Sequence, residues 1–300
     1  MSQFFDTLKA IALSNKSQSE KVKEMQKATG MTATAARQQI ATIVFMSQNE
    51  RRASVRSQIR FTMGVEIECY NINKQSIIDT LRAERINAIS TGYDHTDYAD
   101  TYKLGYDGSI DGSNGCEVVS PVLRNLDSLK KVCKTINEAG AKVNKSCGLH
   151  VHFGAQNFTI AQWVRIIRNY AALESIIDSF MPMSRRGSNN TYCKSIARVA
   201  AYLEDFGADN MRDIENAFRS DRYHKVNVMS FRRHNTIEFR HHSGTTDFTK
   251  IENWINFLRG LLEYSINNET IISASSIDEI PFLTAAQKRY FNERKETLNR

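Results

Sequence analysis

The chain has 300 residues, of which 41% are apolar and 24% are charged, proportions that are ordinary for a folded protein. Three prolines and 14 glycines exclude a collagen-like or low-complexity architecture. The 40 Lys and Arg residues exceed the 33 Asp and Glu residues, so the formal net charge is +7 and the sequence pI is about 9.1. This excess favours an anionic partner, and nucleic acid, nucleotide and membrane surface all remain open.

Targeting and redox signals are sparse. The sequence contains no run near the ~18 consecutive apolar residues that a membrane-spanning helix requires, so we expect no membrane partner. Residues 1–21 lack an early basic region and a convincing apolar stretch, so we expect no secretory signal. The five cysteines are widely spaced and form no CxxC pair, which favours reduced thiols and a cytoplasmic location over a disulfide framework or a thiolate zinc site.

The first 60 residues differ in composition from the rest. They contain ten basic and four acidic residues, a net charge of +6, one glycine and no proline. The remaining 240 residues contain 30 basic and 29 acidic residues, a net charge of +1. This shift predicts a basic helical N-terminal segment over residues 1–60, with a boundary near Ser57–Arg60.

Two or three helices are predicted in this N-terminal segment. Gly30 would end one of them, and Thr32 would cap the next, which carries an apolar stripe at helical spacing over residues 36–44. The arrangement loosely resembles a helix-turn-helix. A small solvated helical bundle or a docking segment is the favoured interpretation, and nucleic-acid binding is the alternative.

From Phe61 to Cys69 apolar and polar residues alternate with period two, which predicts a β-strand. Further strands are predicted at 116–120, 149–153, 225–230 and 236–241, and helices at 75–84, 128–139, 160–181, 195–205, 210–218, 250–266 and 285–298. Capping boxes are predicted for Thr159 with Gln162, Thr249 with Glu252, and Thr284 with Gln287. Because strands and helices alternate without a regular βαβ repeat, we expect an α+β fold with a largely antiparallel sheet.

The first predicted strand carries two carboxylates on one face. Glu66 and Glu68 are two residues apart, so their side chains point the same way, opposite Val65 and Ile67. Two neighbouring negative charges are unfavourable unless they are solvated, protonated or bound to cations. A solvent-exposed face is the simpler interpretation of this pair alone.

A later strand carries two imidazoles in the same way. His150 and His152 share one face, and Gly148 and Gly154 flank them. Glycines allow a ligand to come close to the backbone, and imidazole binds both metals and phosphate. A structural role is more common for a single histidine than for such a pair.

The last predicted strand places Glu238, Arg240 and His242 on one face. A carboxylate beside a guanidinium forms a simple surface ion pair, which contributes little to stability. The same two groups also suit a site that holds a metal and the phosphate that the metal neutralises.

A doubled Asp-Gly-Ser turn, at residues 107–109 and 111–113, precedes a short strand that contains Glu117. Turn formation explains the Asp-Gly-Ser pair. Glu117 lies within an otherwise apolar strand, where a buried carboxylate needs a partner. Together the strands carry four Glu and two His with an Arg beside the last Glu, a set of ligands that suits Mg²⁺ or Mn²⁺.

These segments stand in the order Gly64-Val65-Glu66-Ile67-Glu68, Asp107-Gly108-Ser109, Glu117-Val118-Val119-Ser120-Pro121, Gly148-Leu149-His150-Val151-His152-Phe153, Asn227 and Ile237-Glu238-Phe239-Arg240. Arg185-Arg186 before Tyr192-Cys193, and Arg222-Tyr223 before Asn227, fit the same pattern. The ordered set resembles the amidoligase family, a branch of the glutamine synthetase-like carboxylate–amine ligases. The resemblance covers roughly residues 60–265.

The resemblance implies a curved, largely antiparallel sheet of glutamine synthetase-like type with flanking helices. It implies a catalytic domain over residues 61–270, preceded by the helical segment 1–60 and followed by a helical extension at 271–300. The implied activity is an ATP-dependent ligase that transfers the γ-phosphoryl group to a substrate carboxylate, after which an amine attacks the acyl phosphate. ATP and Mg²⁺ or Mn²⁺ are the implied cofactors.

The resemblance also implies a role for each matching residue. The implied metal ligands are Glu66, Glu68, Glu117, His150 and Glu238. Arg240 is the implied phosphate clamp, and the implied contacts to nucleotide or substrate are His152, Asn227 and Arg222. Arg185, Arg186 and Arg222 are candidates for binding anionic substrate or phosphate, and either Arg185 or Arg186 could be the matching residue. Asp107 is favoured over Asp111 as the functional aspartate.

Two other functions remain open. A metal-dependent hydrolase or nuclease would use the histidines and carboxylates without ATP. A nucleic-acid or protein-binding module with a degenerate ligase core would use the basic residues 1–60 for docking. The sequence leaves open the carboxylate and amine, which could be small molecules or peptides, and the oligomeric state.

Overall fold

The structure is a computed structural model that describes residues 2–56, 61–92 and 99–299, with the backbone alone at residues 2, 3, 5, 6 and 45–56. Contacts divide the chain into two units, Met1–Arg60 and Phe61–Arg300. The expected boundary at Ser57–Arg60 lies outside the described residues.

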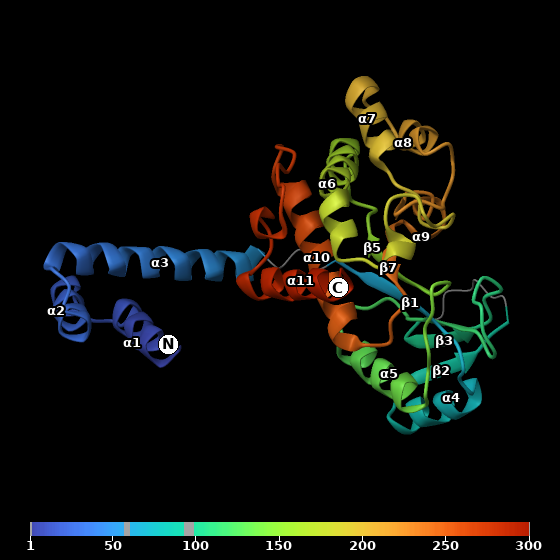
Figure 1. The fold of residues 1–300 in the computed structure, drawn as a ribbon, viewed down its shortest axis with the longest axis horizontal. Helices are drawn as coiled ribbons and strands as arrows, with labels where there is room; N and C mark the ends of the chain where they lie inside the picture. Colours follow the sequence, from blue (N-terminus) through green and yellow to red (C-terminus); the bar gives the residue numbers. More distant parts are fainter. Residues whose placement is uncertain (1, 57–60, 93–98, 300) are drawn as a thin grey trace. The chain divides into compact units, whose positions relative to one another are not determined.

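Within residues 2–56, the N-terminal unit consists of three helices: α1 (Ser2–Leu13), α2 (Gln18–Thr29) and α3 (Ala33–Arg56) (Figure 1). Gly30 adopts a left-handed conformation with φ 72° and ends α2, as predicted. A small apolar core joins the three helices, formed by Leu8, Ala12, Val22, Met25, Ala36, Ile40 and Ile43. The predicted helices and apolar stripe are therefore confirmed.

The second unit is built on one sheet, which in the described part of the chain has seven strands in the order β2-β3-β4-β1-β5-β7-β6. The strands are β1 (Met63–Cys69), β2 (Asn87–Ser90), β3 (Thr101–Gly105), β4 (Cys116–Val119), β5 (Gly148–Gly154), β6 (Val226–Asn227) and β7 (Thr236–Ser243). The β2–β3 pair is parallel, and the other neighbouring strands are antiparallel. The predicted α+β class with a largely antiparallel sheet is confirmed.

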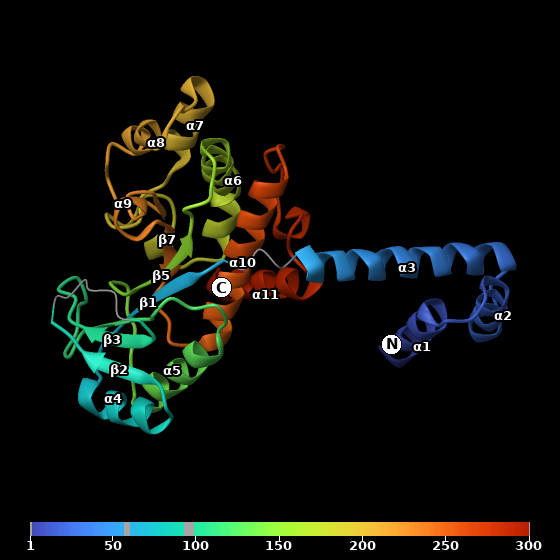
Figure 2. The same ribbon diagram turned by 180° about the vertical axis from the view of Figure 1, so that it is seen from behind.

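Helices flank this sheet (Figures 1 and 2). They are α4 (Lys74–Ala83), α5 (Asp127–Glu138), α6 (Ile160–Ser179), α7 (Ala197–Phe206), α8 (Met211–Ala217), α9 (Phe231–His234), α10 (Phe248–Asn267) and α11 (Ala285–Leu298). Both views place α4 and α5 near β2 and β3, whereas α7, α8 and α9 lie beyond the other end of the sheet.

One face of the sheet packs against helices. The alternate residues Val65 and Ile67 of β1 are almost completely buried. Phe239 of β7 packs against Tyr170 of α6, with ring centroids 5.6 Å apart. Because side chains alternate between faces with period two, this apolar packing fixes the register and turns the carboxylates of β1 to the opposite face.

Several local predictions need correction. The strands β2 and β3 were not expected, and the strand expected at 225–230 comprises only Val226–Asn227 before the chain turns into α9. The Thr159 and Thr284 capping boxes are confirmed, but the Thr249 box is wrong. Asp247 caps α10 instead, because its Oδ1 accepts hydrogen bonds from the backbone N–H groups of Thr249 and Lys250.

His242 lies on the other face of the sheet from the one expected. The pairing of β5 with β7 shifts register between Leu149 and Val151, so His242 pairs with Leu149. Its ring packs on Trp254 of α10 at 5.6 Å, and the side chain is buried. A β-bulge changes which residues share a face, so the period-two argument holds for Glu238 and Arg240 but fails for His242.

A buried ionic network lies behind the sheet. The Lys225 ammonium is fully buried and donates to Glu174 Oε1 at 2.8 Å and to Asp178 Oδ1 at 2.6 Å. Asp178 Oδ1 also lies 2.7 Å from His241 Nε2. The other oxygens of the two acids accept the backbone N–H groups of Ile196 and Gly187, so the network holds both ends of the loop 187–196.

Removal of the Lys225 ammonium should strongly destabilise this unit. In Lys225→Met the carboxylates of Glu174 and Asp178 remain buried without their cation, and we expect a loss of about 3–5 kcal/mol in the free energy of unfolding. Both tryptophans, Trp163 and Trp254, lie in this unit, so their fluorescence during urea unfolding reports on it.

Lys288→Met is the matched control for that variant. Lys288 donates to a backbone carbonyl at an exposed site, and its loss should cost less than about 1 kcal/mol. Equal effects of the two variants would show that the buried network does not stabilise the unit.

The pH dependence of stability should follow His241. Burial lowers the pKa of His241 to about 4, against 6.5 for an ordinary histidine. Between these values the unfolded chain binds more protons than the folded chain, so stability falls as the pH falls. From pH 7 to pH 5 we expect His241 to contribute a loss of about 2 kcal/mol in the free energy of unfolding, measured by urea unfolding at each pH.

His241→Gln tests the origin of that slope. The variant lacks one titrating group, so its stability should change less between pH 7 and pH 5 than that of the wild type, and the remaining slope comes from groups such as His242, whose pKa burial also lowers well below its usual value. If stability changes with pH as steeply in His241→Gln as in the wild type, groups other than His241 cause the pH dependence. Asp178 contributes only below this window, because hydrogen bonds from His241 and Lys225 outweigh its burial and lower its pKa to about 2.

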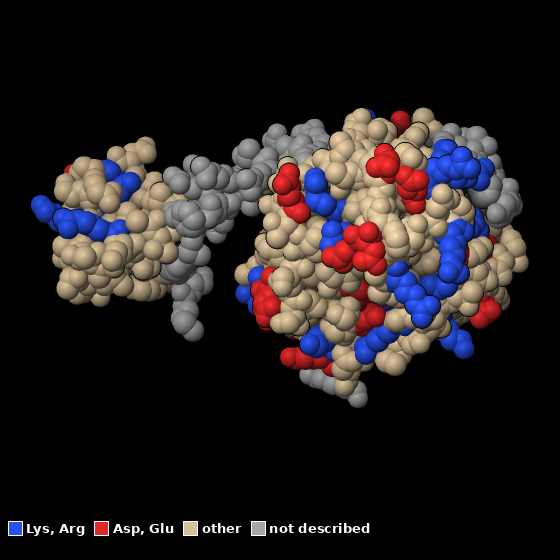
Figure 3. Space-filling view, turned by 90° about the horizontal axis from the view of Figure 1, so that it is seen from above, with Lys and Arg blue, Asp and Glu red and all other residues tan. Residues whose placement is uncertain are grey.

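The surface of the unit from Phe61 to Arg300 mixes both signs of charge. On the face seen in Figure 3, acidic groups lie among basic ones, and Lys and Arg side chains form a band. This agrees with the near balance of 30 basic and 29 acidic residues after residue 60. Among the described residues, no helix is long and apolar enough to cross a membrane.

Candidate active site

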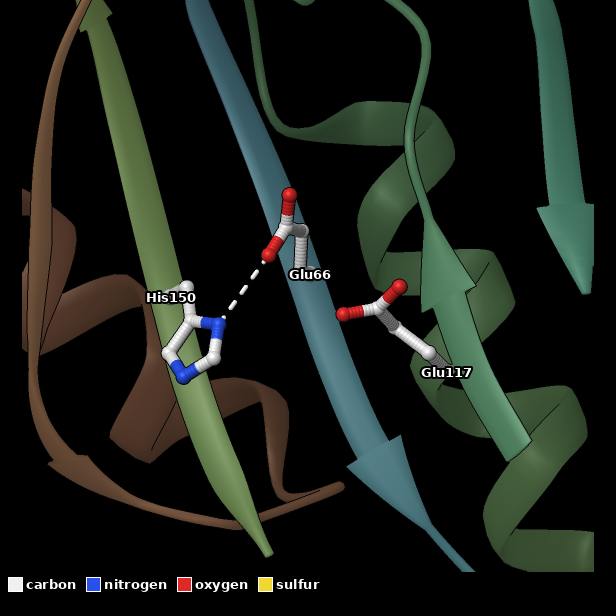
Figure 4. A group of neighbouring side chains, drawn as sticks. All are labelled: Glu66, Glu117 and His150. Carbon is white, nitrogen blue, oxygen red and sulfur yellow. Dashed lines mark hydrogen bonds and ion pairs between the residues drawn. The ribbon is translucent and has the colours of Figure 1, made fainter. Parts of the chain in front are cut away.

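Strand pairing gathers the acidic and imidazole side chains on the face of the sheet that the helices leave open. Glu66 of β1 pairs with His150 of β5, and Glu68 pairs with Glu117 of β4. Side chains of paired residues project to the same face. Figure 4 shows Glu66, Glu117 and His150 pointing toward one another from three adjacent strands.

Glu66 lies between the two histidines. Its Oε2 is 3.0 Å from His150 Nδ1, and its Oε1 is 3.3 Å from His152 Nε2. The far nitrogen of His152, Nδ1, is 3.0 Å from Thr236 Oγ1, which fixes the orientation of the ring. Glu66 therefore contacts both imidazoles of β5, one with each oxygen of its carboxylate.

Glu68 lies deeper and is tied to the start of β5. It is 5% exposed, and its Oε2 accepts the backbone N–H of Gly148 at 2.5 Å. Its Oε1 is 3.6 Å from His150 Nε2. A side chain added at Gly148 would place its Cβ 2.7 Å from that same nitrogen, so the predicted close approach of backbone and site is confirmed at this position.

Glu238 on β7 closes the other side of the cluster. Its Oε1 accepts a hydrogen bond from Arg240 Nη1 at 2.5 Å, and its Oε2 accepts one from Asn227 Nδ2 at 2.5 Å. The same Oε1 is 3.8 Å from His150 Nδ1 and 3.9 Å from His152 Nε2. Glu238 thus links the arginine to the histidine pair.

The carboxylates differ in how their charge is balanced. Burial tends to raise the pKa of Glu66, but His152 and His150 outweigh it and hold the pKa well below its usual range. Burial also opposes the charge of Glu238, whose pKa is nevertheless lowered by Arg240 and His152. Glu117 has no such partner among the described residues: burial raises its pKa well above the usual range, and Glu66 and Glu68 raise it further.

Among the side chains that the structure describes, three groups offer ligand atoms within 4.8 Å of one another. They are Glu66, Glu117 and His150; Glu66, His152 and Glu238; and Glu68, Asp107 and Glu117. Carboxylate oxygens with one imidazole suit Mg²⁺ or Mn²⁺. His152 Nε2 is buried within this cluster and makes no hydrogen bond, so the residues fit a divalent cation that would use this nitrogen and neutralise Glu117.

The cluster forms one wall of a cavity of about 410 Å³. The cavity is also lined by four arginines, Arg185, Arg222, Arg233 and Arg240. Planar guanidinium groups suit bidentate contacts to phosphate or carboxylate. Acids that can hold metal therefore face a second group of residues that can hold an anion.

The structure places most of the predicted site residues in this cavity. All five residues implied as metal ligands line it or belong to the clusters above, together with His152, Asn227 and Arg222. Of the two consecutive arginines, Arg185 lines the cavity and donates to the backbone carbonyl of Cys147, whereas Arg186 lines a separate shallow cavity near α11. Asp107 lies at the cluster, and Asp111 does not line the cavity.

Other residues of the cavity were given no role from the sequence. Arg233 and His234 lie on the single turn of α9, which the sequence does not distinguish from a connection between strands. Tyr192 and Tyr223 form an edge-to-face pair with ring centroids 5.2 Å apart, and Arg222 stacks over Tyr223 at 5.0 Å. In the sequence, the pairs Arg185-Arg186 and Arg222-Tyr223 were the features that pointed to this part of the site.

A comparison with protein-family models identifies the same region. The model described as "Putative amidoligase enzyme" matches residues 59–262, about two thirds of the chain. No curated protein matches the chain. The matched range contains the whole candidate site, from Glu66 to Arg240. The chain therefore belongs to the amidoligase family, whose description is that of a ligase.

Proposed function

We propose that this protein is an ATP-dependent carboxylate–amine ligase that works through an acyl phosphate. In such a reaction a carboxylate oxygen attacks the γ-phosphorus of ATP, and ADP leaves. The amine nitrogen then attacks the acyl carbon, inorganic phosphate leaves, and the amine loses a proton. The net change is one amide bond formed for each ATP converted to ADP and phosphate.

One observation carries the proposal: a cluster of carboxylates and imidazoles shares a cavity with four arginines. Phosphoryl transfer needs little covalent chemistry from the protein, and its rate depends on positioning and on neutralising the charge of the phosphates. A divalent cation held by Glu66, Glu117 and His150 would neutralise part of this charge. The acidic side of the cavity suits the cations, and the arginines suit the phosphates.

Within this proposal Arg240 holds the transferred phosphoryl group. Its guanidinium is fixed by Glu238 Oε1 through Nη1, which leaves other N–H groups to donate to phosphate oxygens. Asn227 fixes the other oxygen of Glu238, so that carboxylate cannot rotate away from the cluster. Arg185 and Arg222 would bind the remaining phosphates or an anionic substrate.

The fold agrees with this chemistry, and we infer that it is of glutamine synthetase-like type. The sheet is open and largely antiparallel, one face is covered by helices, and the ligands project from adjacent strands on the other face. Ligands on rigid strands are positioned more tightly than ligands on loops, which suits a reaction that depends on geometry.

The proposal is tested by ADP release in the presence of Mg²⁺. Carboxylates are screened in pairs with amines, and hydroxylamine serves as a small general amine that traps acyl phosphates. We expect ADP to appear only when both a carboxylate and an amine are present, together with a product whose mass equals the sum of the two minus one water. ADP release that depends on neither the carboxylate nor the amine would show that the protein is a simple ATPase.

A further inference from the structure

The turn between α2 and α3 is short and well defined. Three residues separate the two helices, and the first of them is Gly30 in its left-handed conformation. The Met31 backbone N–H donates to Thr29 Oγ1 at 3.2 Å. Thr32 Oγ1 accepts the backbone N–H of Ala35 at 3.3 Å and so caps α3. Two helices joined by a tight turn that contains glycine are the elements of a helix-turn-helix.

The helices α1 and α2 pack against the start of α3. Figures 1 and 2 show both of them beside the first half of this helix. The apolar core joins Leu8 of α1 and Met25 of α2 to Ala36, Ile40 and Ile43 of α3. The three α3 residues follow the spacing of one helix face, so the opposite face of residues 33–44 is turned to solvent.

This outer face of α3 is polar but almost uncharged. Its exposed residues are Thr34, Arg37, Gln38, Ala41 and Thr42, and Arg37 is the only charged residue in the sequence from 33 to 44. A helix that only faces solvent usually carries several charged side chains there. Arginine makes two hydrogen bonds to guanine, glutamine makes two to adenine, and the methyl groups of alanine and threonine contact that of thymine. The face therefore carries the residue types that recognise base edges in the major groove of DNA.

The charge of α2 suits a phosphate backbone. Lys23 and Lys27 are exposed and lie one turn apart on the helix. Both acids of α2 are engaged within the unit, because Glu20 takes part in the capping box and Glu24 pairs with Lys16. On the face of this unit seen in Figure 3, basic side chains occupy more of the surface than acidic ones. With its net charge of +6, the unit is complementary to a polyanion.

We propose that the N-terminal unit binds double-stranded DNA and recognises its sequence with the start of α3. This helix lies in the major groove, where Arg37 and Gln38 contact base edges. Lys23 and Lys27 of α2 contact phosphates, which positions α3 without discriminating between sequences. The major groove of an RNA duplex is too narrow for a helix, so DNA is the favoured nucleic acid. This activity is separate from the proposed ligase reaction, whose residues lie in the other unit.

Selection from a library of short DNA duplexes with a randomised centre tests the proposal on the full chain. Duplexes that the protein retains at physiological salt are amplified and selected again. The enriched duplex is then compared with an unselected one by fluorescence anisotropy. We expect a short enriched motif that is bound about 100-fold or more tightly than the unselected duplex. Absence of an enriched motif would overturn the proposal, and so would single-stranded RNA that binds as tightly as the enriched duplex.

Gln38→Ala and Arg37→Lys test the recognition helix without a change of charge. Both positions are exposed and all four residue types are good helix formers, so the variants should fold like the wild type. Each loses one bidentate base contact, and the preference for the enriched duplex should fall about tenfold while affinity for the unselected duplex is kept. Gln75→Ala, at an exposed position of α4, is the control and should keep the full preference. A preference that survives in both α3 variants would overturn the assignment of α3.

Lys23→Ala and Lys27→Ala should behave differently from the α3 variants. Each removes one phosphate contact, so affinity should fall for the enriched and the unselected duplex alike. The slope of log Kd against log salt concentration should become shallower by about 1. Lys134→Ala, at an exposed ion pair on α5, should leave affinity and slope unchanged. Wild-type affinity and slope in both α2 variants would contradict the proposed position of α2.

The catalytic variant separates this proposal from the ligase. Glu66→Gln should bind the enriched duplex as tightly as the wild type does, and loss of this binding would place the DNA site outside the N-terminal unit and overturn the proposal. Sequence-specific DNA binding by a protein that releases no ADP would reject the ligase and keep the DNA site. ADP release by a protein that binds no duplex would reject the DNA site and keep the ligase.

Discussion

Glu66→Gln should abolish the ADP-forming activity of this protein. Glu66 contacts both histidines of β5 and belongs to two of the three groups that can hold a cation. The substitution keeps the size of the side chain but removes the charge and one acceptor oxygen, so a cation would bind weakly and in the wrong place. We expect a loss of about 1,000-fold or more in kcat/KM, measured as ADP released with Mg²⁺.

The control is Glu204→Gln. Glu204 on α7 forms an exposed ion pair with Arg168 on α6. This variant should retain full activity. Tryptophan fluorescence must show that Glu66→Gln is folded, because the low pKa of Glu66 means that its charge contributes to the stability of the unit. Wild-type activity in folded Glu66→Gln would show that Glu66 is not a ligand of an essential metal ion, and would contradict the proposed metal site.

Arg240→Lys should have an effect of similar size for a different reason. The guanidinium of Arg240 contacts Glu238 and faces the cavity, where it can reach a phosphate at the same time. A lysine ammonium cannot make both sets of contacts in the same plane. If Arg240 stabilises the transferred phosphoryl group, kcat should fall about 1,000-fold while the affinity for Mg²⁺ and AMP-PNP falls much less.

Arg232→Lys is the matched control, because Arg232 also forms a fork with a carboxylate, that of Glu215, but does not line the cavity. This variant should keep its kcat. A large rise in KM for ATP with unchanged kcat in Arg240→Lys would show that Arg240 only binds the nucleotide. Equal losses of kcat in Arg240→Lys and Arg232→Lys would indicate a general effect of replacing arginine by lysine.

The strand faces of the site could be predicted from the sequence because period-two alternation is a local property. Glu66, Glu68, His150 and His152 each lie on the face that alternation gives them. Strand order and register are not local. The sequence could not show that β1 lies between β4 and β5, or that Glu66 pairs with His150, since these depend on pairs of residues at least 47 positions apart, such as Cys69 and Cys116.

Other parts of the site had no local signal. β3 has only five residues, and its sequence gave no clear alternation, so this strand was not expected. Arg185 and Arg186 are adjacent and chemically identical, and only the three-dimensional path of the loop, held by Glu174 and Asp178, sends one of them into the cavity. The bulge on β7 reversed the side of His242 for the same reason.

The range matched by the family model contains the candidate site that the strands assemble, and the net charge says little about this site. Six of the seven excess positive charges lie in the first 60 residues, outside the unit that carries the site. The unit itself is almost neutral and concentrates acids and arginines on the two sides of one cavity. We expect the basic helices to serve docking rather than catalysis.

Transfer of oxygen from the carboxylate to phosphate tests the central claim most directly. A carboxylate that supports ADP release is labelled with ¹⁸O on both oxygens, and the inorganic phosphate is analysed by mass spectrometry after reaction with the amine. An acyl phosphate passes one labelled oxygen to phosphate for each amide formed, so one ¹⁸O should appear in each phosphate released. Unlabelled phosphate, release of AMP and pyrophosphate, or an amide formed or cleaved without nucleotide would contradict an ATP-dependent ligase that works through an acyl phosphate.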